Sequence, residues 1–442
     1  MNYKKSISFL ALFILFLVLP LSAQTIKQEI FETVEKSGGV YYPYQYNKPT
    51  YTPAPRGYKP VYITHYARHG SRWMTKDAQY QRVLDEFEAA DKNNALSEYG
   101  KDVYRRVQLI AADAIKRHAG DLSPLGAQQH AGIAERMYDN FPQVFKGKKA
   151  INTYSTIVPR CILSMHSFNQ TIKGKNPKLA ITAEANMRTS TYLNAQAYHP
   201  LINKEFKYIR DNKQAEWRKV QANFAQKELN PDRIMSLLFN GNAYAKNSID
   251  GVNLMIILYH MASNLQNLDL DISLYDIFEK EEMYYLWLIE NYRFYASFGT
   301  SPLNEGYPAF YATALLKDIV ERTDKALADK EVAADLRFGH DTSLMPFLSL
   351  IQLPNSYAVE TDLVKIGDLW QSYKLSPMAA NIQFIFYEKK KSDKVLVKIL
   401  HNEQEVALPL EADNYPYYDW KKLKQYFLER IDFQYQKMGY TQ

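Results

Sequence analysis

Short apolar segments alternate with longer amphipathic ones along most of the chain. Runs rich in β-branched and aromatic residues predict strands, and apolar residues with helical spacing predict helices. On this pattern we expect strands over residues 61–66, 150–154, 179–183, 334–338, 381–388 and 395–400. We expect helices over 80–90, 99–118, 126–141, 307–330 and 343–351. The stretch 38–60, rich in Tyr, Pro and Gly, predicts an extended arm over the surface.

The pattern changes between about residues 200 and 300. Helical segments such as 249–266 and 281–295 dominate there, with few strand signals between them. We therefore predict an α/β fold: a central mixed sheet flanked by helices, with an inserted, mainly helical cap domain. The expected core runs over 24–195 and 305–442, and the expected cap occupies 196–304.

The N-terminus has the pattern of a signal peptide. Lys4 and Lys5 precede an uncharged apolar run at 7–19, and Ala23 supplies the small residue before a cleavage point. The run is shorter than the roughly 20 apolar residues that a membrane span needs, which disfavours an uncleaved anchor. We therefore expect removal of residues 1–23 and a periplasmic or secreted mature protein that does not associate with a membrane.

Composition narrows the classes of partner and compartment. Without Lys4 and Lys5, 52 basic residues face 48 acidic ones, a balance that does not indicate nucleic-acid binding. The single Cys161 excludes an intramolecular disulfide, and a mature chain of this length buries enough apolar surface without one. We expect Cys161 to be a small core residue on a helix. The pattern fits a bacterial periplasm or the cell exterior.

One short segment brings charged side chains together. Arg68 and Arg72 bracket His69 where a predicted strand ends. Arginine suits phosphate oxygens because its planar fork makes paired, charge-assisted hydrogen bonds and stays protonated. His340 and Asp341 follow another predicted strand in the same way. Ligands of open α/β sheets bind beyond the carboxyl ends of strands, so we expect the two turns to converge on one crevice.

These segments resemble the histidine acid phosphatases, the branch of the histidine phosphatase superfamily that includes the phytases. The resemblance extends over nearly the whole mature chain. It is carried by Arg68-His69-Gly70-Ser71-Arg72, Leu122-Ser123-Pro124-Leu125-Gly126 with Gln129-His130 after it, Tyr154-Ser155-Thr156-Ile157-Val158-Pro159-Arg160, Gly339-His340-Asp341-Thr342 and a terminal hairpin followed by Leu400-His401-Asn402. In its overall sequence pattern the chain is most similar to bacterial multiple inositol polyphosphate phosphatases.

The resemblance implies a covalent mechanism without a metal or a cofactor. His69 would attack phosphorus and form a phosphohistidine, with its other ring nitrogen fixed by a hydrogen bond. Asp341 would protonate the leaving alcohol and then assist the water that attacks the phosphoenzyme, which favours activity at acidic pH. The phosphate oxygens would be bound by Arg68, Arg72, Arg160 and His340.

Two positions depart from the family pattern. Met74 stands where the motif usually carries Pro, which affects only the stiffness of the turn. His340-Asp341 stands where many multiple inositol polyphosphate phosphatases carry His-Ala-Glu, so the proton donor is shorter and one residue nearer. We expect a small phosphomonoester substrate, with inositol polyphosphates such as phytate favoured and simpler sugar phosphates left open. Lys76 and Arg188 are candidates for further contacts with a highly phosphorylated substrate.

Simpler interpretations of some of these residues remain. Asp341 stands before a predicted helix, where Asp usually serves as the N-cap. His65 and His69 are four residues apart, but a strand that enters a turn does not place them on one helical face, which disfavours a metal pair. Gly70 is expected to let the backbone approach the substrate closely. A non-catalytic phosphoanion-binding protein is the alternative from another class, and an intact Asp341 argues against it.

Overall fold

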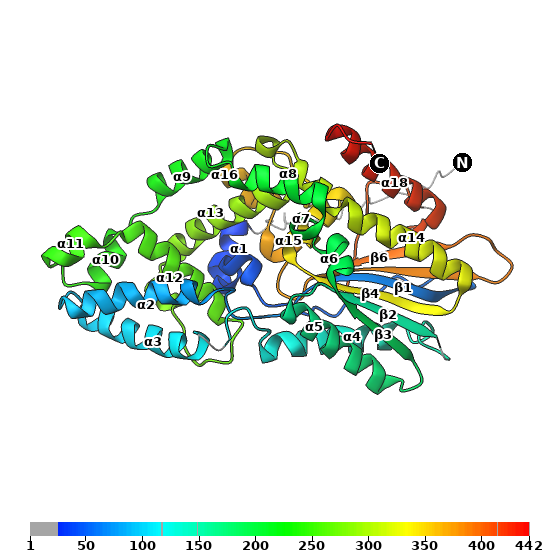
Figure 1. Cartoon of the computed structure of the whole chain (residues 1–442), viewed down its shortest axis with the longest axis horizontal. Coiled ribbons are helices and arrows are strands. Elements are labelled where there is room, and N and C mark those ends of the chain that lie inside the picture. Colours follow the sequence, from blue (N-terminus) through cyan, green and yellow to red (C-terminus); the bar gives the residue numbers. More distant parts are fainter. Residues whose placement is uncertain (1–24, 116–117, 148, 413, 442) are drawn as a thin grey trace, which may run out of the picture.

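The strands of the protein form one mixed sheet (Figure 1). The computed structural model describes residues 25–115, 118–147, 149–412 and 414–441, so the predicted signal peptide at 1–23 lies outside the described residues. The strands are β1 (Tyr58–Arg68), β2 (Ala150–Ser155), β3 (Ala180–Ala185), β4 (Val332–Gly339), β5 (Asn381–Lys389), β6 (Leu396–His401), β7 (Gln404–Glu405) and β8 (Tyr417–Asp419). Their order is β3-β2-β4-β1-β5-β6-β7, with β8 paired to β6. Because β1 runs parallel to β4 and antiparallel to β5, the predicted mixed α/β sheet is confirmed.

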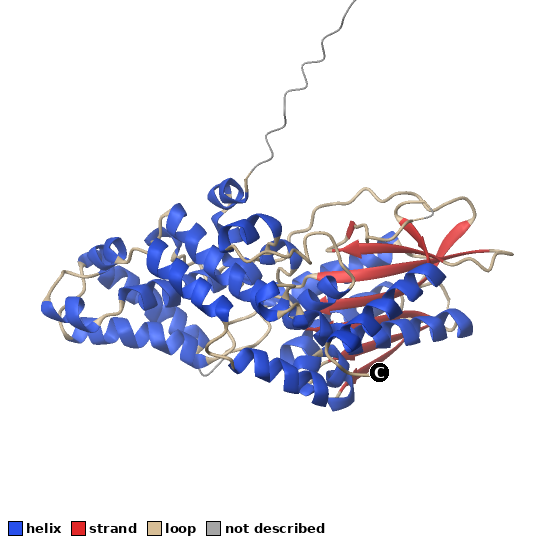
Figure 2. Cartoon of the chain, turned by 90° about the horizontal axis from the view of Figure 1, so that it is seen from above, coloured by secondary structure: helices blue, strands red, loops and turns tan. Residues whose placement is uncertain are grey.

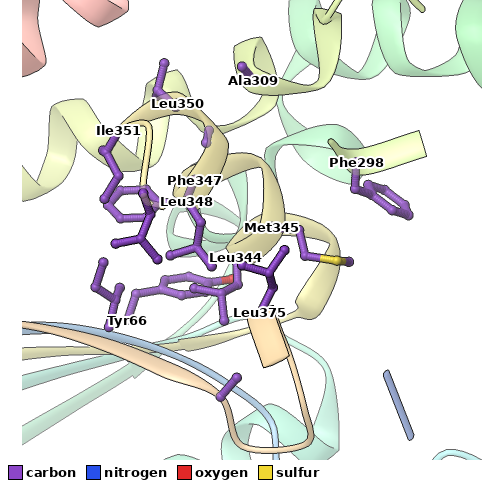
Figure 3. Packing of buried hydrophobic residues seen from close by; sticks show 14 of the residues in the cluster. Tyr66, Phe298, Ala309, Leu344, Met345, Phe347, Leu348, Leu350, Ile351 and Leu375 are labelled. Carbon is purple, nitrogen blue, oxygen red and sulfur yellow. The ribbon is translucent and has the colours of Figure 1, made fainter. Parts of the chain in front are cut away.

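Helices cover both faces of this sheet (Figure 1). One face carries α4 (Pro124–Asn140) and α5 (Pro159–Lys175), and the other carries α14 (Thr313–Asp329), α15 (Asp341–Leu350) and α18 (Trp420–Lys437). The alternation of side chains along a strand explains the two cores. Ile63 and Ala67 of β1 pack toward α4 and α5, whereas Tyr66 packs against Leu344 and its neighbours on α15 (Figure 3).

The helices farther from the sheet share a third core (Figure 2). They are α2 (Asp77–Lys92), α3 (Glu98–Ala114), α9 (Glu216–Glu228), α10 (Asp232–Leu238), α11 (Ala243–Ser248), α12 (Gly251–Leu265) and α13 (Lys280–Phe298). We call these elements the helical region. Val83 of α2 and Val107 of α3 belong to the same hydrophobic cluster as Ile234 and Leu258, so the helical region draws on two separate stretches of the sequence. The boundaries at 196–304 stay a prediction.

Shorter elements complete the described chain. They are α1 (Ile26–Glu32), η1 (Val34–Tyr41), α6 (Met187–Leu193), α7 (Ala195–Tyr198), α8 (Pro200–Asp211), η2 (Tyr275–Ile277), η3 (Pro302–Asn304), η4 (Tyr307–Ala312), α16 (Leu363–Leu369) and α17 (Ser372–Leu375). Within the described ranges, no helix is both long and apolar enough to cross a membrane.

The N-terminal arm follows the expected surface course over 41–60, where no residue is buried, but not at 38–40. Its first residues are buried, because Ser37, Gly38, Gly39 and Val40 lie in the 3₁₀ helix η1 inside the protein. The Val40 carbonyl accepts a hydrogen bond from Arg68 at the end of β1. The start of the arm is therefore part of the wall behind the residues that follow this strand.

Candidate active site

β1 and β4 end side by side, and the two histidine-bearing turns follow them directly. Arg68 pairs with Gly339 in the parallel register, and the His69 N–H donates to the Gly339 carbonyl at 2.9 Å. The ring centroids of His69 and His340 lie 5.7 Å apart. The two turns therefore meet at the carboxyl edge of the sheet, where open α/β sheets bind their ligands.

His69 presents one ring nitrogen with a lone pair. Its Nδ1 lies 2.9 Å from the Gly70 carbonyl oxygen, which can only accept, so Nδ1 carries the hydrogen and Nε2 keeps the lone pair. The side chain is buried. Burial lowers the pKa of His69 well below its ordinary value, and the charges of Arg160 and Arg68 lower this pKa further. The imidazole is therefore neutral even in mild acid, which is the form that a nucleophile requires.

Arg68 is held rigidly at the end of β1. Its Nη1 donates to the carbonyls of Val40 at 2.6 Å and Ser376 at 2.7 Å, and the side chain is fully buried. Its Nη2 lies 3.0 Å from Asp341 Oδ2, an ion pair without the alignment of a hydrogen bond. Burial lowers the pKa of Arg68 to about 10, so the guanidinium stays charged at neutral pH.

Two further arginines share the environment of His69. Arg72 donates from Nη1 to the Trp73 carbonyl at 2.8 Å, and Arg160 lies half-buried near the start of α5. The charges of both lower the pKa of His69. The Nε atoms of Arg68, Arg72 and Arg160 are all buried, and no acceptor within the described part of the chain takes their hydrogens. Three cations with unused donors suit an anion that carries several oxygens.

His340 and Asp341 lie where β4 turns into α15. The N-cap position belongs to His340, and Asp341 is the first helical residue, so the interpretation of Asp341 as the helix cap is wrong by one position. His340 Nε2 lies 3.3 Å from Thr156 Oγ1, and burial together with the charge of Arg160 lowers the pKa of His340 to about 3. Burial raises the pKa of Asp341, but positive charges, led by that of Arg68, outweigh burial and lower it. Asp341 is therefore ionised at neutral pH.

The start of α4 supports the turn that carries His69. A Cβ on Gly70 would lie 2.3 Å from the Gly126 carbonyl oxygen, so the turn and the helix touch backbone to backbone. His130 Nε2 donates to the Arg68 carbonyl at 3.1 Å. Contact with α4, rather than approach of a substrate, is what requires glycine at position 70.

The two candidates for extra substrate contacts lie outside this buried cluster. Lys76 is exposed at the N-cap position of α2. The Arg188 side chain is 76% exposed and pairs with Glu184 at 2.5 Å. Their contact with a substrate stays a prediction.

The motifs do not indicate that Cys161 lies beside His340 or that His65 lies among aromatic rings. Cys161 is buried on α5, as expected, but its Sγ lies 3.7 Å from His340 Nε2 and donates to the Gly339 carbonyl at 3.2 Å. The His65 ring lies 5.5 Å from the rings of Phe168 and Phe338, in the apolar core between the sheet and α5. His65 is therefore a core residue on the sheet face that packs against α5.

Two residues of this site escape sequence reasoning altogether. The ring of Tyr41, at the end of η1, lies 5.4 Å from Cζ of Arg72. Burial lowers the pKa of Arg293 on α13, but the charge of Glu290, with smaller effects of Tyr41 and Asp341, raises it overall. Arg293 Nη2 pairs with Glu290 Oε2 at 2.8 Å. Its only sequence signal is a lone cation after a mostly aromatic helical stretch.

The fold and the site define an α/β protein with a histidine centre suited to oxyanions. The chain belongs to the histidine phosphatase superfamily (branch 2), whose sequence model it matches over residues 66–402. The resemblance drawn from the motifs is thereby confirmed. A comparison with curated protein sequences gives no match.

Solved structures of related proteins share the fold at low sequence identity. The Bifidobacterium longum multiple inositol polyphosphate phosphatase, in complex with inositol hexasulfate, superposes with a TM-score of 0.75 at 19% identity, over 88% of this chain and 97% of that chain. The phytase of D. castellii gives 0.67 at 14% identity, over 92% and 88%. The Citrobacter braakii phytase gives 0.53 at 12% identity, over 85% and 99%. At these identities the likeness establishes the fold.

Proposed function

We propose that the protein is an exported phosphomonoester hydrolase that forms a phosphohistidine on His69 and acts on inositol polyphosphates such as phytate. The observation that carries the proposal is a buried, neutral His69 whose Nε2 keeps its lone pair among arginines with unused donors. Such a group can attack an electrophile and is not consumed by a proton. The arginines supply the neutralisation of equatorial oxygens that phosphoryl transfer requires.

In the first step, His69 Nε2 forms a bond to phosphorus in line with the ester oxygen. The bond from phosphorus to that oxygen breaks, and the alcohol leaves with a proton taken from Asp341. In the second step, water attacks phosphorus while Asp341 accepts its proton, and the bond from phosphorus to nitrogen breaks. Inorganic phosphate and neutral His69 are restored.

The first step needs a protonated Asp341, although positive charge holds its pKa low. A bound phosphate would place negative charge beside the Arg68 guanidinium. It would so cancel the main cause that lowers the pKa of Asp341. The effect of burial, which raises the pKa of Asp341, would then dominate. Substrate binding would therefore load the carboxyl group with the proton that the leaving alcohol needs.

The preference for inositol polyphosphates rests on two supports. One is the likeness in fold to a multiple inositol polyphosphate phosphatase in complex with inositol hexasulfate. The other is Arg293, which pairs with Glu290 at 2.8 Å and whose pKa is also raised by the charge of Asp341. A simpler sugar phosphate is the second candidate substrate. A protein that only binds phosphoanions would have no use for a carboxyl group at Asp341.

The test is phosphate release by the purified mature protein. We expect release from phytate without added metal and in the presence of a chelator, with protein quenched in alkali carrying phosphate on a histidine. His69→Ala should lose both turnover and the labelled phosphoenzyme. Failure to release phosphate from any monoester across acidic and neutral pH would refute the enzymatic proposal.

The choice of substrate is tested separately. A panel of phytate, sugar phosphates and an aryl phosphate, with chromatography of the inositol phosphate products, gives kcat/KM for each class. A kcat/KM for sugar phosphates above that for phytate would favour the second candidate.

Export is tested at the N-terminus. Sequencing of the mature protein from a periplasmic or culture fraction should find Gln24 as the first residue. Retention of residues 1–23 on a membrane-bound protein would contradict the proposed compartment.

A further inference from the structure

The loop that carries Arg72 is also held from the helical region. At the C-terminal end of α12, Asn264 Nδ2 donates to the Arg72 carbonyl at 2.9 Å. Just beyond the helix, Asn267 Oδ1 accepts from Ser71 Oγ at 2.7 Å. Both asparagines are buried, so these bonds form away from competing water.

The branch through Asn267 continues at both ends. Ser71 Oγ accepts from Gln129 Nε2 at 2.9 Å, and Asn267 Nδ2 donates to the Tyr41 carbonyl at 2.7 Å. Asn267 thus links α4 and the Arg72 loop to η1. The side chain of Tyr41 lies against Arg72, so this branch fixes the ring that packs on the guanidinium.

The branch through Asn264 fixes the main chain of the same loop. Its Oδ1 accepts from the Tyr80 hydroxyl at 2.8 Å, and that hydroxyl accepts from the Met74 N–H at 2.8 Å. Asn264 and Tyr80 therefore hold the loop at Arg72 and at Met74 from the same direction. Tyr80, on α2, is also fully buried.

We propose that Asn264 and Asn267 are positioning residues for Arg72, so that the helical region sets the geometry of phosphate binding. The inference rests on the proposed function, in which Arg72 binds a phosphate group. The two asparagines act through the backbone of Arg72 and through the Tyr41 ring beside its side chain. A misplacement of about 1 Å in a binding group can cost about 10²-fold in rate. A buried network also loses more than one bond when one member is removed.

The experiment compares single and double variants of the full mature chain. Asn267→Ala should lower kcat/KM and weaken the binding of inorganic phosphate, measured by calorimetry, by about 10- to 100-fold each. Arg72→Ala should lose at least as much. The double variant, Asn267→Ala with Arg72→Ala, should lose no more than Arg72→Ala alone, because the asparagine acts through that arginine.

The matched control is Asn304→Ala. Asn304 is a buried asparagine whose amide also has two main-chain partners, Ala296 and Gly306, in η3 and its surroundings. We expect this variant to lower the melting temperature and to leave kcat/KM and phosphate affinity unchanged. If Asn267→Ala does not fold, Ser71→Ala breaks the same branch from the loop side, and it keeps the bond between the Ser71 N–H and Gln129.

The outcomes separate this inference from the proposed function. Losses in the double variant that add to those of Arg72→Ala, or an Asn267→Ala variant that changes only its melting temperature, would overturn the positioning role. A wild-type protein that binds phosphate but releases none from monoesters would overturn the proposed activity instead. In that case, the phosphate affinities of the same variants still decide the positioning role.

Discussion

The two sides of the active site are built by different means. On the sheet side, main-chain groups fix the geometry: carbonyls of Val40 and Ser376 hold Arg68, and His69 bonds to the backbones of Gly339 and Ala379. On the helical side, main-chain bonds to residues 120–123 also hold the loop, and side chains of the helical region add to them. Arg72 depends on Asn264 for its carbonyl and has the Tyr41 ring beside its guanidinium.

This difference determines which side of the active site can change its geometry through substitution of side chains. Backbone groups are present whatever the side chain, so the sheet side keeps its arrangement through many substitutions nearby. A geometry that depends on side chains changes with one substitution. We infer that the sheet side holds the bond-breaking chemistry constant, while the helical side is where affinity for different phosphate esters is set.

The largest expected effect belongs to the proton donor on the sheet side. Asp341→Asn should lower kcat by about 10²- to 10⁴-fold for alkyl esters such as phytate, because the poor leaving group loses its proton source. The loss for an activated aryl phosphate should be far smaller. Steady-state kinetics with both substrates measures this ratio, and Asn264→Ala on the helical side should lower both rates equally. Equal losses in Asp341→Asn would contradict the role of proton donor.

Arginine-to-lysine substitutions compare the two sides directly. Arg68→Lys should cost about 10²-fold in kcat/KM and also lower the melting temperature, because a single ammonium nitrogen cannot lie at the place of Nη1, between the two carbonyls, and at the place of Nη2 and Nε at once. Arg72→Lys should cost about 10-fold, with little change in melting temperature, because within the described residues its Nη1 has only the Trp73 carbonyl as a hydrogen-bond partner to lose. The reverse order would show that the helical side is the more constrained.

Acid should destabilise the sheet side. Burial lowers the pKa of His65, His69, His130, His340 and His401, so these groups stay neutral in the folded protein. The unfolded chain protonates them near pH 6.5. The unfolded state therefore binds more protons, and the free energy of unfolding falls as pH drops below about 6.5.

Calorimetric scans between neutral pH and about pH 5 should show a decrease of at least about 5 °C in melting temperature. Inorganic phosphate should reduce the decrease, because it binds the folded site. A melting temperature that rises on acidification would contradict the neutral state of these histidines.

The smallest effects are expected at the outer cations. Lys76→Ala and Arg188→Ala should each raise KM for phytate by no more than about threefold, because both side chains are exposed and screened. Neither should affect a monophosphate substrate. An increase of tenfold or more in KM for either variant would place that residue in direct contact with the substrate. The residues that set substrate affinity would then extend beyond the buried hydrogen-bond network.

The residues that follow strand ends were within reach of the sequence. His69, His340 and Asp341 could be brought together because strand patterns end where polar side chains begin, and parallel strands end at one edge. Pattern reasoning failed where a side chain works by a long-range contact. Asn264 and Asn267 lie at the end of an apolar helical pattern, which gives no sign that their partners are Ser71 and Arg72.

The same limit explains the errors at the N-terminal arm and at Gly70. Tyr-, Pro- and Gly-rich composition indicates an irregular segment, but it cannot tell a surface course from burial beneath the site. The contact between Gly70 and Gly126 likewise depends on how α4 docks. Such information resides in tertiary packing, not in local propensity.

The pair of hydrogen bonds that holds Arg68, here called the clamp, has a consequence for biosynthesis. Its two carbonyl partners lie at positions 40 and 376, so one hydrogen-bonding nitrogen joins segments near opposite ends of the chain. A nascent chain that has not yet emerged as far as Ser376 cannot complete the clamp. Enzymatic activity would thus appear only after synthesis has passed Ser376 and the chain has folded, so shorter fragments would not hydrolyse phosphate esters.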